Sequence, residues 1–198
     1  MNLEDLGRAL SARPFGTLER SAIGPGYRGL PGAFTPAAVL VPLFEAGGEP
    51  RVLLTRRRGD LRRHPGQISF PGGRVDEGDP DSLSAALREA REEVGIEPGD
   101  VAVLGRLSET LVVMTGFLLT PWVGLVPYPY PWVANPGEVA EVIEAPLADL
   151  ERAGAHWTET REVHGMVHEL HFFTLGKDTI WGATARILFE LLTVGRSA

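Results

Sequence analysis

The chain has 198 residues, a formal net charge of −7 and no cysteine, which excludes disulfides, a cysteine nucleophile and thiolate metal sites. An apolar content of 43% with 23% charged residues is ordinary for a one-domain globular protein, and the acidic balance argues against bulk binding of nucleic acid. No apolar run approaches the ~20 residues of a membrane span, and no basic-then-apolar leader opens the chain. We therefore expect a cytoplasmic protein that binds neither nucleic acid nor a membrane.

The N-terminal part predicts a helix followed by an irregular arm. Residues 2–12 have the apolar spacing of a short amphipathic helix, and a stretch rich in glycine and proline follows from Pro14 to Pro36. We assign residues 1–35 to this helix and arm, and residues 36–198 to one domain. Three glycines in the arm have the spacing of a dinucleotide-binding loop: Gly24, Gly26 and Gly29. They follow no strand and open no helix, so the match is dismissed.

The rest of the chain mixes strand and helix patterns. Apolar and β-branched segments predict strands at 37–45, 51–57, 101–107, 117–126, 139–145, 156–163 and 167–175. Pro146 opens a short helix that runs to about Glu151, and residues 183–194 predict a closing helix. Such a mixture indicates an α/β fold in which helices cover both faces of a mixed sheet.

A further helix carries three carboxylates on one face. Asp79 and Pro80 predict its N-cap and first residue, and Gly95 predicts a left-handed stop. At about 100° per residue, three glutamates fall within one arc of the helix: Glu89, Glu92 and Glu93. Like charges one turn apart cost a few tenths of a kcal/mol, so the cluster is a local penalty unless a cation compensates it. Either a hard divalent cation binds these oxygens, or the helix presents a solvated acidic face.

The loop before this helix favours the cation. Phe70, Pro71, Gly72 and Gly73 predict a tight turn at which main-chain groups can approach an ion or a phosphate. Loop and helix together resemble the box of the Nudix hydrolases. The matching residues are Gly73, Asp79, Arg88, Glu89, Glu92, Glu93, Gly95 and Ile96. The spacer from Asp79 to Arg88 is one residue longer than in the commonest box, and an aspartate stands where glutamate is usual.

The residues upstream narrow the resemblance. Residues 53–57 and 61–70 look like the extra signature of the coenzyme A pyrophosphatase branch, in which an arginine, a histidine and a glycine precede Phe-Pro-Gly-Gly. The residues at those offsets are Arg62, His64 and Gly66. The branch also tends to have the longer spacer and the aspartate. Where it usually has a serine after the paired basic residues, this chain has Arg58.

The resemblance implies an α/β/α sandwich and the hydrolysis of coenzyme A, or a derivative, to 3′,5′-ADP and 4′-phosphopantetheine with Mg²⁺ or Mn²⁺. The candidate metal ligands are Gly73, through its carbonyl oxygen, Glu89, Glu92 and Glu93. The candidate catalytic residues are Arg88, Glu89, Glu92, Glu138 and Glu141. Any of the last four can be the general base, and a structural salt bridge is the alternative for Glu141. The candidate substrate-binding residues are Arg56, Arg57, Arg62 and His64, with a purely structural role left open for His64.

Several alternatives stay open. The same fold can act on ADP-ribose, a dinucleotide or a nucleoside triphosphate, and a sensor domain without hydrolysis is disfavoured because all three box glutamates are present. The tryptophans and tyrosines between Trp122 and Trp132 either stack on a base or pack a proline-stiffened loop onto the core. A zinc site at His164, His168 and His171 is rejected, because residues on one strand alternate between its faces. A homodimer is left open.

Overall fold

The structure is a computed structural model that describes residues 2–12, 34–61, 64–112, 115–163 and 166–198. Its large mixed sheet contains β1 (Thr35–Ala46), β2 (Glu49–Arg57), β3 (Ile68–Ser69), β4 (Gly72–Arg74), β5 (Ala102–Arg106), β6 (Thr110–Val112), β7 (Phe117–Leu125) and β8 (Val139–Pro146). Its small antiparallel sheet contains β9 (His156–Val163), β10 (Met166–Leu175) and β11 (Asp178–Trp181). The helices are α1 (Leu3–Ala12), α2 (Ser82–Val94), α3 (Leu147–Glu151) and α4 (Gly182–Arg196), with a 3₁₀ turn, η2 (Pro98–Asp100).

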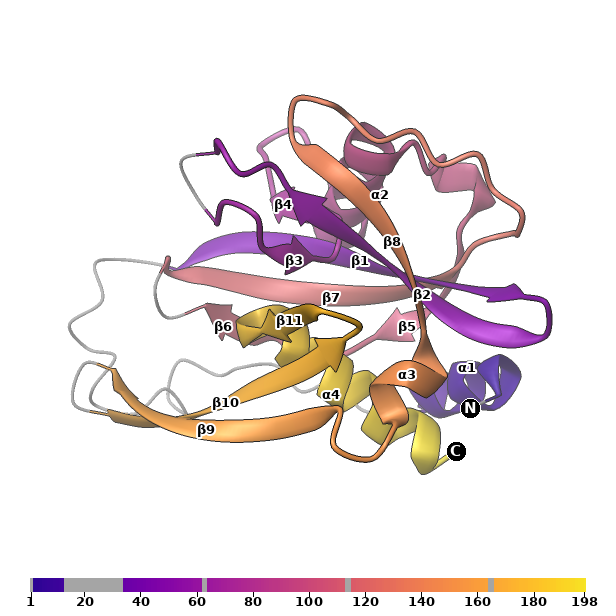
Figure 1. The fold of residues 1–198 in the computed structure, drawn as a ribbon. Coiled ribbons are helices and arrows are strands. Elements are labelled where there is room, and N and C mark those ends of the chain that lie inside the picture. The colour runs from indigo at the N-terminus through magenta and orange to yellow at the C-terminus, as the bar shows by residue number, and fades with distance from the viewer. Residues whose placement is uncertain (1, 13–33, 62–63, 113–114, 164–165) are drawn as a thin grey trace.

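The large sheet is built around β1, which runs parallel to β7 and antiparallel to β2 and β4. In Figure 1, α2 lies on one side of this sheet, whereas α4 and the small sheet lie on the other. Because side chains alternate along a strand, β1 supplies both cores. Val39 and Val41 pack toward α4, and Ala38 and Leu40 pack toward α2. Burial on both faces explains why β1 is an almost continuous apolar run.

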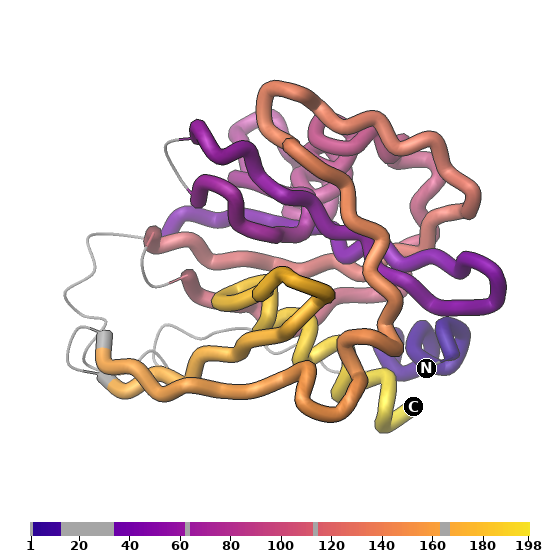
Figure 2. Tube along the Cα trace, viewed as in Figure 1, coloured from indigo at the N-terminus to yellow at the C-terminus, as the bar shows by residue number. Residues whose placement is uncertain are grey.

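Helix α1 packs beside α4 (Figure 2) and buries Leu6 and Leu10 completely in the core on that side. The division of the chain at residue 35 stays a prediction, and the arm at 13–33 lies outside the described residues. Among the described helices, none is long and apolar enough to span a membrane.

The strands and helices predicted from periodicity are confirmed, with ends shifted by one or two residues. The sequence reasoning missed β3, β4, β6 and β11, because strands of two to four residues are too short to show a period. Their positions are set by long-range pairing, as when β4 joins β1 through Ala38 and Gly73.

The start of α2 differs from the prediction. Its N-cap is Asp81, whose Oδ1 accepts a hydrogen bond from the Ser84 backbone N–H at 2.8 Å. Asp79, the predicted cap, instead bonds to Arg88 through both carboxylate oxygens. The same carboxylate also accepts a hydrogen bond from the Asp76 backbone N–H at 2.9 Å, and its charge-assisted bidentate pair with Arg88 is stronger than a single bond to a helix N–H. The predicted stop is confirmed, since Gly95 has φ 73° and its N–H donates to Arg91 O.

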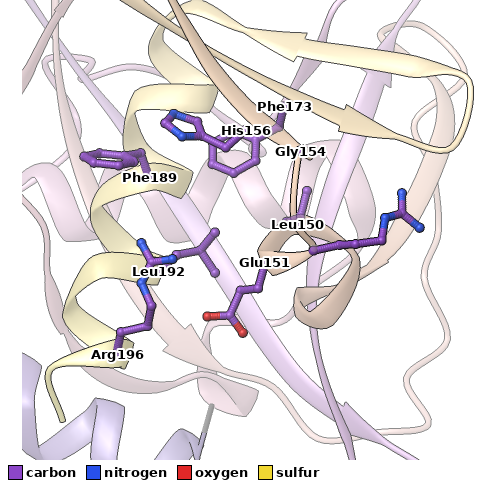
Figure 3. A pocket seen from close by; sticks show the side chains of 9 residues that line it. Leu150, Glu151, Gly154, His156, Phe173, Phe189, Leu192 and Arg196 are labelled. Carbon is purple, nitrogen blue, oxygen red and sulfur yellow. The ribbon is translucent and has the colours of Figure 1, made fainter.

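A pair of histidines lies between the small sheet and α4. His156 Nε2 and His171 Nδ1 are 3.0 Å apart, and both rings stack on Phe189. Figure 3 shows His156 with Phe173 and Phe189 around a cavity of about 90 Å³. Of the three histidines considered for zinc, His171 is thus held in this pair, and His164 lies outside the described residues. Within the described ranges no cluster of three potential ligands could hold a metal there.

We predict that this pair makes stability depend on pH. Burial lowers the pKa of both histidines below 6.5, aided by Arg196 beside His156 and by Arg186 and His156 beside His171. At these two groups the unfolded chain therefore binds more protons below about pH 6.5, so that the contribution of the pair to the free energy of unfolding falls as pH drops through this range. A His156→Gln, His171→Gln double variant should therefore gain melting temperature relative to the wild type as pH is lowered from 7.5 to 5.5, because it lacks the two groups that must remain unprotonated. An unchanged pH dependence in the double variant would contradict this.

Candidate functional site

The three glutamates of α2 run from the core to the surface. Small residues on the inner face of the helix, Ala86 and Ala90, let it lie close to the large sheet. The Glu93 side chain is 3% exposed, that of Glu89 16% and that of Glu92 56%. The three glutamates therefore lie on one face of the helix, as predicted, and the innermost of them, Glu93, is a buried carboxylate.

Burial and mutual repulsion make these carboxylates reluctant to ionise together. Burial raises the pKa of Glu93 to about 8, with Arg57 opposing the shift and with Glu138 and Glu89 adding to it. The pKa of Glu89 is also raised, first by burial, against the lowering effect of Arg88. Glu92 and Glu138 both raise it further. Such a group of carboxylates favours a cation among them.

Two glycines of β4 let this cluster form. A Cβ at Gly73 would overlap the carboxylate of Glu89, and a Cβ at Gly72 would overlap Ala38 O of β1. The Gly72 backbone N–H also donates a hydrogen bond to the Glu93 carboxylate. The Gly-Gly pair is thus required by the close approach of β4 to both α2 and β1.

Arg88 joins the loop before α2 to the helix. Its Nε and Nη2 each lie 3.0 Å from a carboxylate oxygen of Asp79, and Nη2 also donates to Arg74 O. Its Nη1 donates to Glu89 Oε1 at 2.9 Å and to Glu92 Oε2 at 3.4 Å. Arg88 therefore connects Asp79, at the start of the longer spacer, to the middle of α2, and it fixes the position of the Glu89 carboxylate.

The oxygen atoms of this site are of the kind that a divalent cation binds, but they are not arranged around a single point. Carboxylate and carbonyl oxygens are the ligands that Mg²⁺ and Mn²⁺ prefer. Within the described ranges, however, no three acidic or histidine side chains are arranged as a ready metal site. The reason is that Glu89 and Glu92 are turned to Arg88, and Glu93 faces Arg57 with Oε1 and Nη1 at 3.7 Å.

Glu138 and Glu141, which follow the Asn-Pro-Gly turn at residues 135–137, lie in different surroundings. Glu138 is half-buried and acts electrostatically on both Glu89 and Glu93. Glu141 instead accepts a hydrogen bond from Arg56 Nε at 2.8 Å, which is the salt bridge considered as its alternative. Adjacent positions on β2 face opposite sides of the sheet, so Arg56 and its partner lie away from the carboxylates of α2.

The predicted substrate-binding residues are dispersed in the same way. Arg57 faces Glu93, whereas Arg56 is held by Glu141 and by Asp178 of β11 at 2.8 Å. His64 has φ 53°, unusual for a residue other than glycine, and its Nδ1 lies 2.8 Å from Gln67 Oε1. Such strain is often found at functional loops. Arg62 lies outside the described residues.

The sequence reasoning missed Gln67, which orients His64, and Asn135, whose backbone N–H donates to Glu93 O at 2.8 Å. The only signal for Asn135 was the turn-forming sequence that it begins. The aromatic residues between Trp122 and Trp132 pack onto the core: Tyr130 and Trp132 lie against the cluster of buried residues beneath α2.

Comparison with known proteins identifies related chains. The NUDIX domain family model matches residues 34–171. The chain is 44% identical over 155 residues to an uncharacterized Nudix hydrolase NudL of Cronobacter sakazakii, covering 78% of this chain and 80% of the relative. It is 42% identical over 156 residues to NudL of Photorhabdus laumondii, covering 78% and 82%.

Solved structures show the same fold. A MutT/nudix family protein from Enterococcus faecalis aligns with a TM-score of 0.60 at 18% identity, covering 100% of this chain and 75% of that one. The NUDIX domain of NrtR from Shewanella oneidensis, solved with ADP ribose, aligns with a TM-score of 0.50 at 21% identity, covering 61% and 77%.

We predict that Gly72→Ala destabilises the protein by about 1–3 kcal/mol, because the added methyl group would overlap the backbone of β1 at Ala38 O and Val39 Cα, which cannot move aside as a flexible side chain can. Gly78→Ala is the matched control, since nothing lies within 4 Å of a Cβ there. Its effect should stay within about 0.5 kcal/mol. Denaturant unfolding of the two variants measures both values, and equal stabilities would show that Gly72 is not under this constraint.

Proposed function

This chain belongs to the NUDIX family and is a Nudix pyrophosphohydrolase, and we propose that it cleaves the pyrophosphate bond of coenzyme A, or a CoA derivative, with Mg²⁺ or Mn²⁺ bound. The α/β fold with a mixed sheet that the sequence predicted is confirmed. The observation that carries the proposal is an acidic cluster beside β4: the Glu89 carboxylate lies against Gly73, the Gly72 N–H donates to Glu93, and Glu138 acts electrostatically on both glutamates. The narrower CoA assignment is supported by the arginine, histidine and glycine at positions 62, 64 and 66, which resemble the signature of the coenzyme A pyrophosphatase branch.

The chain's own residues supply most of the mechanism. A divalent cation, when bound, neutralises phosphate charge and lowers the pKa of a water molecule. Glu89, Glu92, Glu93 and the Gly73 carbonyl would hold it. Arg88 keeps Glu89 in place, and Arg57 supplies a positive charge 3.7 Å from the Glu93 carboxylate.

The reaction itself needs one base. The water oxygen bonds to one phosphorus of the pyrophosphate, the P–O bond of the anhydride breaks, and a carboxylate accepts the proton from the water. We propose Glu138 for this step, because its carboxylate interacts with Glu89 and Glu93 while Glu141 is bonded to Arg56. ADP-ribose is the second candidate substrate, since the NrtR domain was solved with that ligand.

A substrate panel tests the assignment. With Mg²⁺ or Mn²⁺, CoA should give 3′,5′-ADP and 4′-phosphopantetheine, identified by mass, and without a divalent ion turnover should be lost. Glu92→Gln should lower kcat by on the order of 10²-fold or more, because a ligand oxygen beside the reacting water is removed. Glu77→Gln, an exposed residue of the loop before α2, should change kcat little. Turnover of ADP-ribose with none of CoA would overturn the CoA assignment and leave the family unchanged.

The general base is tested by a matched pair of variants. Glu138→Gln should lower kcat about 10²- to 10⁴-fold and flatten the acidic limb of the pH–rate profile, because the group that must be deprotonated is gone. Glu141→Gln removes the same charge on the opposite face of the sheet and should keep that limb. If Glu141→Gln instead gives the larger loss, the proton acceptor has been misassigned.

A further inference from the structure

Arg58 lies where three segments around the carboxylates meet. The pairing of β2 with β8 shifts register between Arg56 and Arg57 and ends at Arg57 and Val139. Immediately beyond it, the Arg58 backbone N–H donates to Glu138 O at 2.9 Å, and Arg58 O accepts from the Gly66 N–H at 3.3 Å. The backbone of residue 58 thus joins the Glu138 turn to the loop that carries His64.

The Arg58 side chain makes a further contact with the Glu138 turn. Its Nη1 donates to Pro136 O at 2.6 Å. Its Nε and Nη2 form a bidentate pair with the two carboxylate oxygens of Asp60, at 2.8 and 2.6 Å. A bidentate pair fixes the plane of a guanidinium, so Asp60 determines where the remaining donor points.

The opposite side of the turn is fixed to α2. Asn135 and Val133 donate backbone hydrogen bonds to Glu93 O at 2.8 Å and Val94 O at 3.0 Å. Within the turn, Asn135 Oδ1 accepts from the Gly137 N–H at 2.9 Å. The turn is therefore held between the C-terminal end of α2 on one side and Arg58 on the other, and Glu138 lies at the Arg58 side.

We propose that Arg58 is a positioning residue for Glu138: its guanidinium, oriented by Asp60, holds the turn of residues 135–138 so that the Glu138 carboxylate stays over Glu89 and Glu93. The inference rests on the proposed function, in which Glu138 accepts the proton. The competing role, direct contact between Arg58 and a substrate phosphate, is an outcome of the test below.

Steady-state kinetics of Arg58→Ala give the first measurement. Displacing a reacting group by about 1 Å can cost on the order of 10²-fold in rate, so kcat should fall about 10- to 100-fold while KM changes little. Arg58→Lys should recover only part of this loss, because an ammonium cannot make the bidentate pair. Arg161→Ala is the matched control: Arg161 is also exposed and also pairs with an acidic residue two positions away, Glu159, at 2.8 Å. It should behave as wild type.

Asp60→Asn separates positioning from substrate contact. It leaves the charge of Arg58 intact and removes only the carboxylate that orients the guanidinium. Positioning predicts a fall in kcat in the same direction as Arg58→Ala. A rise in KM for Arg58→Ala with wild-type kinetics for Asp60→Asn would overturn positioning in favour of phosphate contact.

A double-mutant cycle decides whether Arg58 acts through Glu138. If it does, Arg58→Ala should lower kcat no further in a Glu138→Gln background, because the group it positions is already gone. Additive losses, or no loss in Glu138→Gln alone, would overturn the inference. If Arg58→Ala does not fold by circular dichroism, the same cycle is run with Asp60→Asn. All variants are assayed on whichever panel substrate wild type hydrolyses, and inactivity of wild type on the whole panel would contradict the proposed function instead.

Discussion

Burial of the Glu93 carboxylate against the large sheet is the constraint on which the rest of the site depends. A carboxylate with 3% of its side chain exposed is costly unless it is compensated, and its pKa of about 8 shows that Arg57 at 3.7 Å and the Gly72 N–H compensate it only in part. The small residues that permit this burial, Gly72 and Gly73 on β4, also bring Glu89 against the same strand. Close packing of α2 on the sheet thus brings carboxylates together that repel one another, and such a group favours a bound cation.

The two faces of the large sheet carry different groups of charged residues. The face under α4 carries the larger core and the ion pairs of Arg56 with Glu141 and Asp178, of which the second joins the large sheet to the small one. The face under α2 carries Arg57 and the carboxylates. Because successive residues of β2 point to opposite faces, two neighbouring arginines serve the fold and the candidate site separately.

The acidic surface is completed by segments that are distant in sequence. The turn that carries Glu138 is bonded to the last residues of α2 and to Arg58 at the end of β2, and Arg58 also reaches the loop of His64. The turn of residues 135–138 is thereby held from two sides. Positioning of this kind is what hydrolysis of a charged anhydride requires, since the reaction needs oxygens at fixed places more than it needs a reactive side chain.

The sequence alone determined the strands of five or more residues, the main helices, the Gly95 stop and the common face of the three glutamates, because these follow from local periodicity and backbone conformation. It also carried the resemblance to the family that the chain belongs to. Only the tertiary structure decided that Asp79 serves Arg88 while Asp81 caps α2, and that Glu138 rather than Glu141 approaches the carboxylates. Those outcomes depend on contacts between residues that are far apart in the chain. Which partner a side chain binds is decided by distance and charge in the folded protein, and the spacing of residues in the sequence does not contain that information.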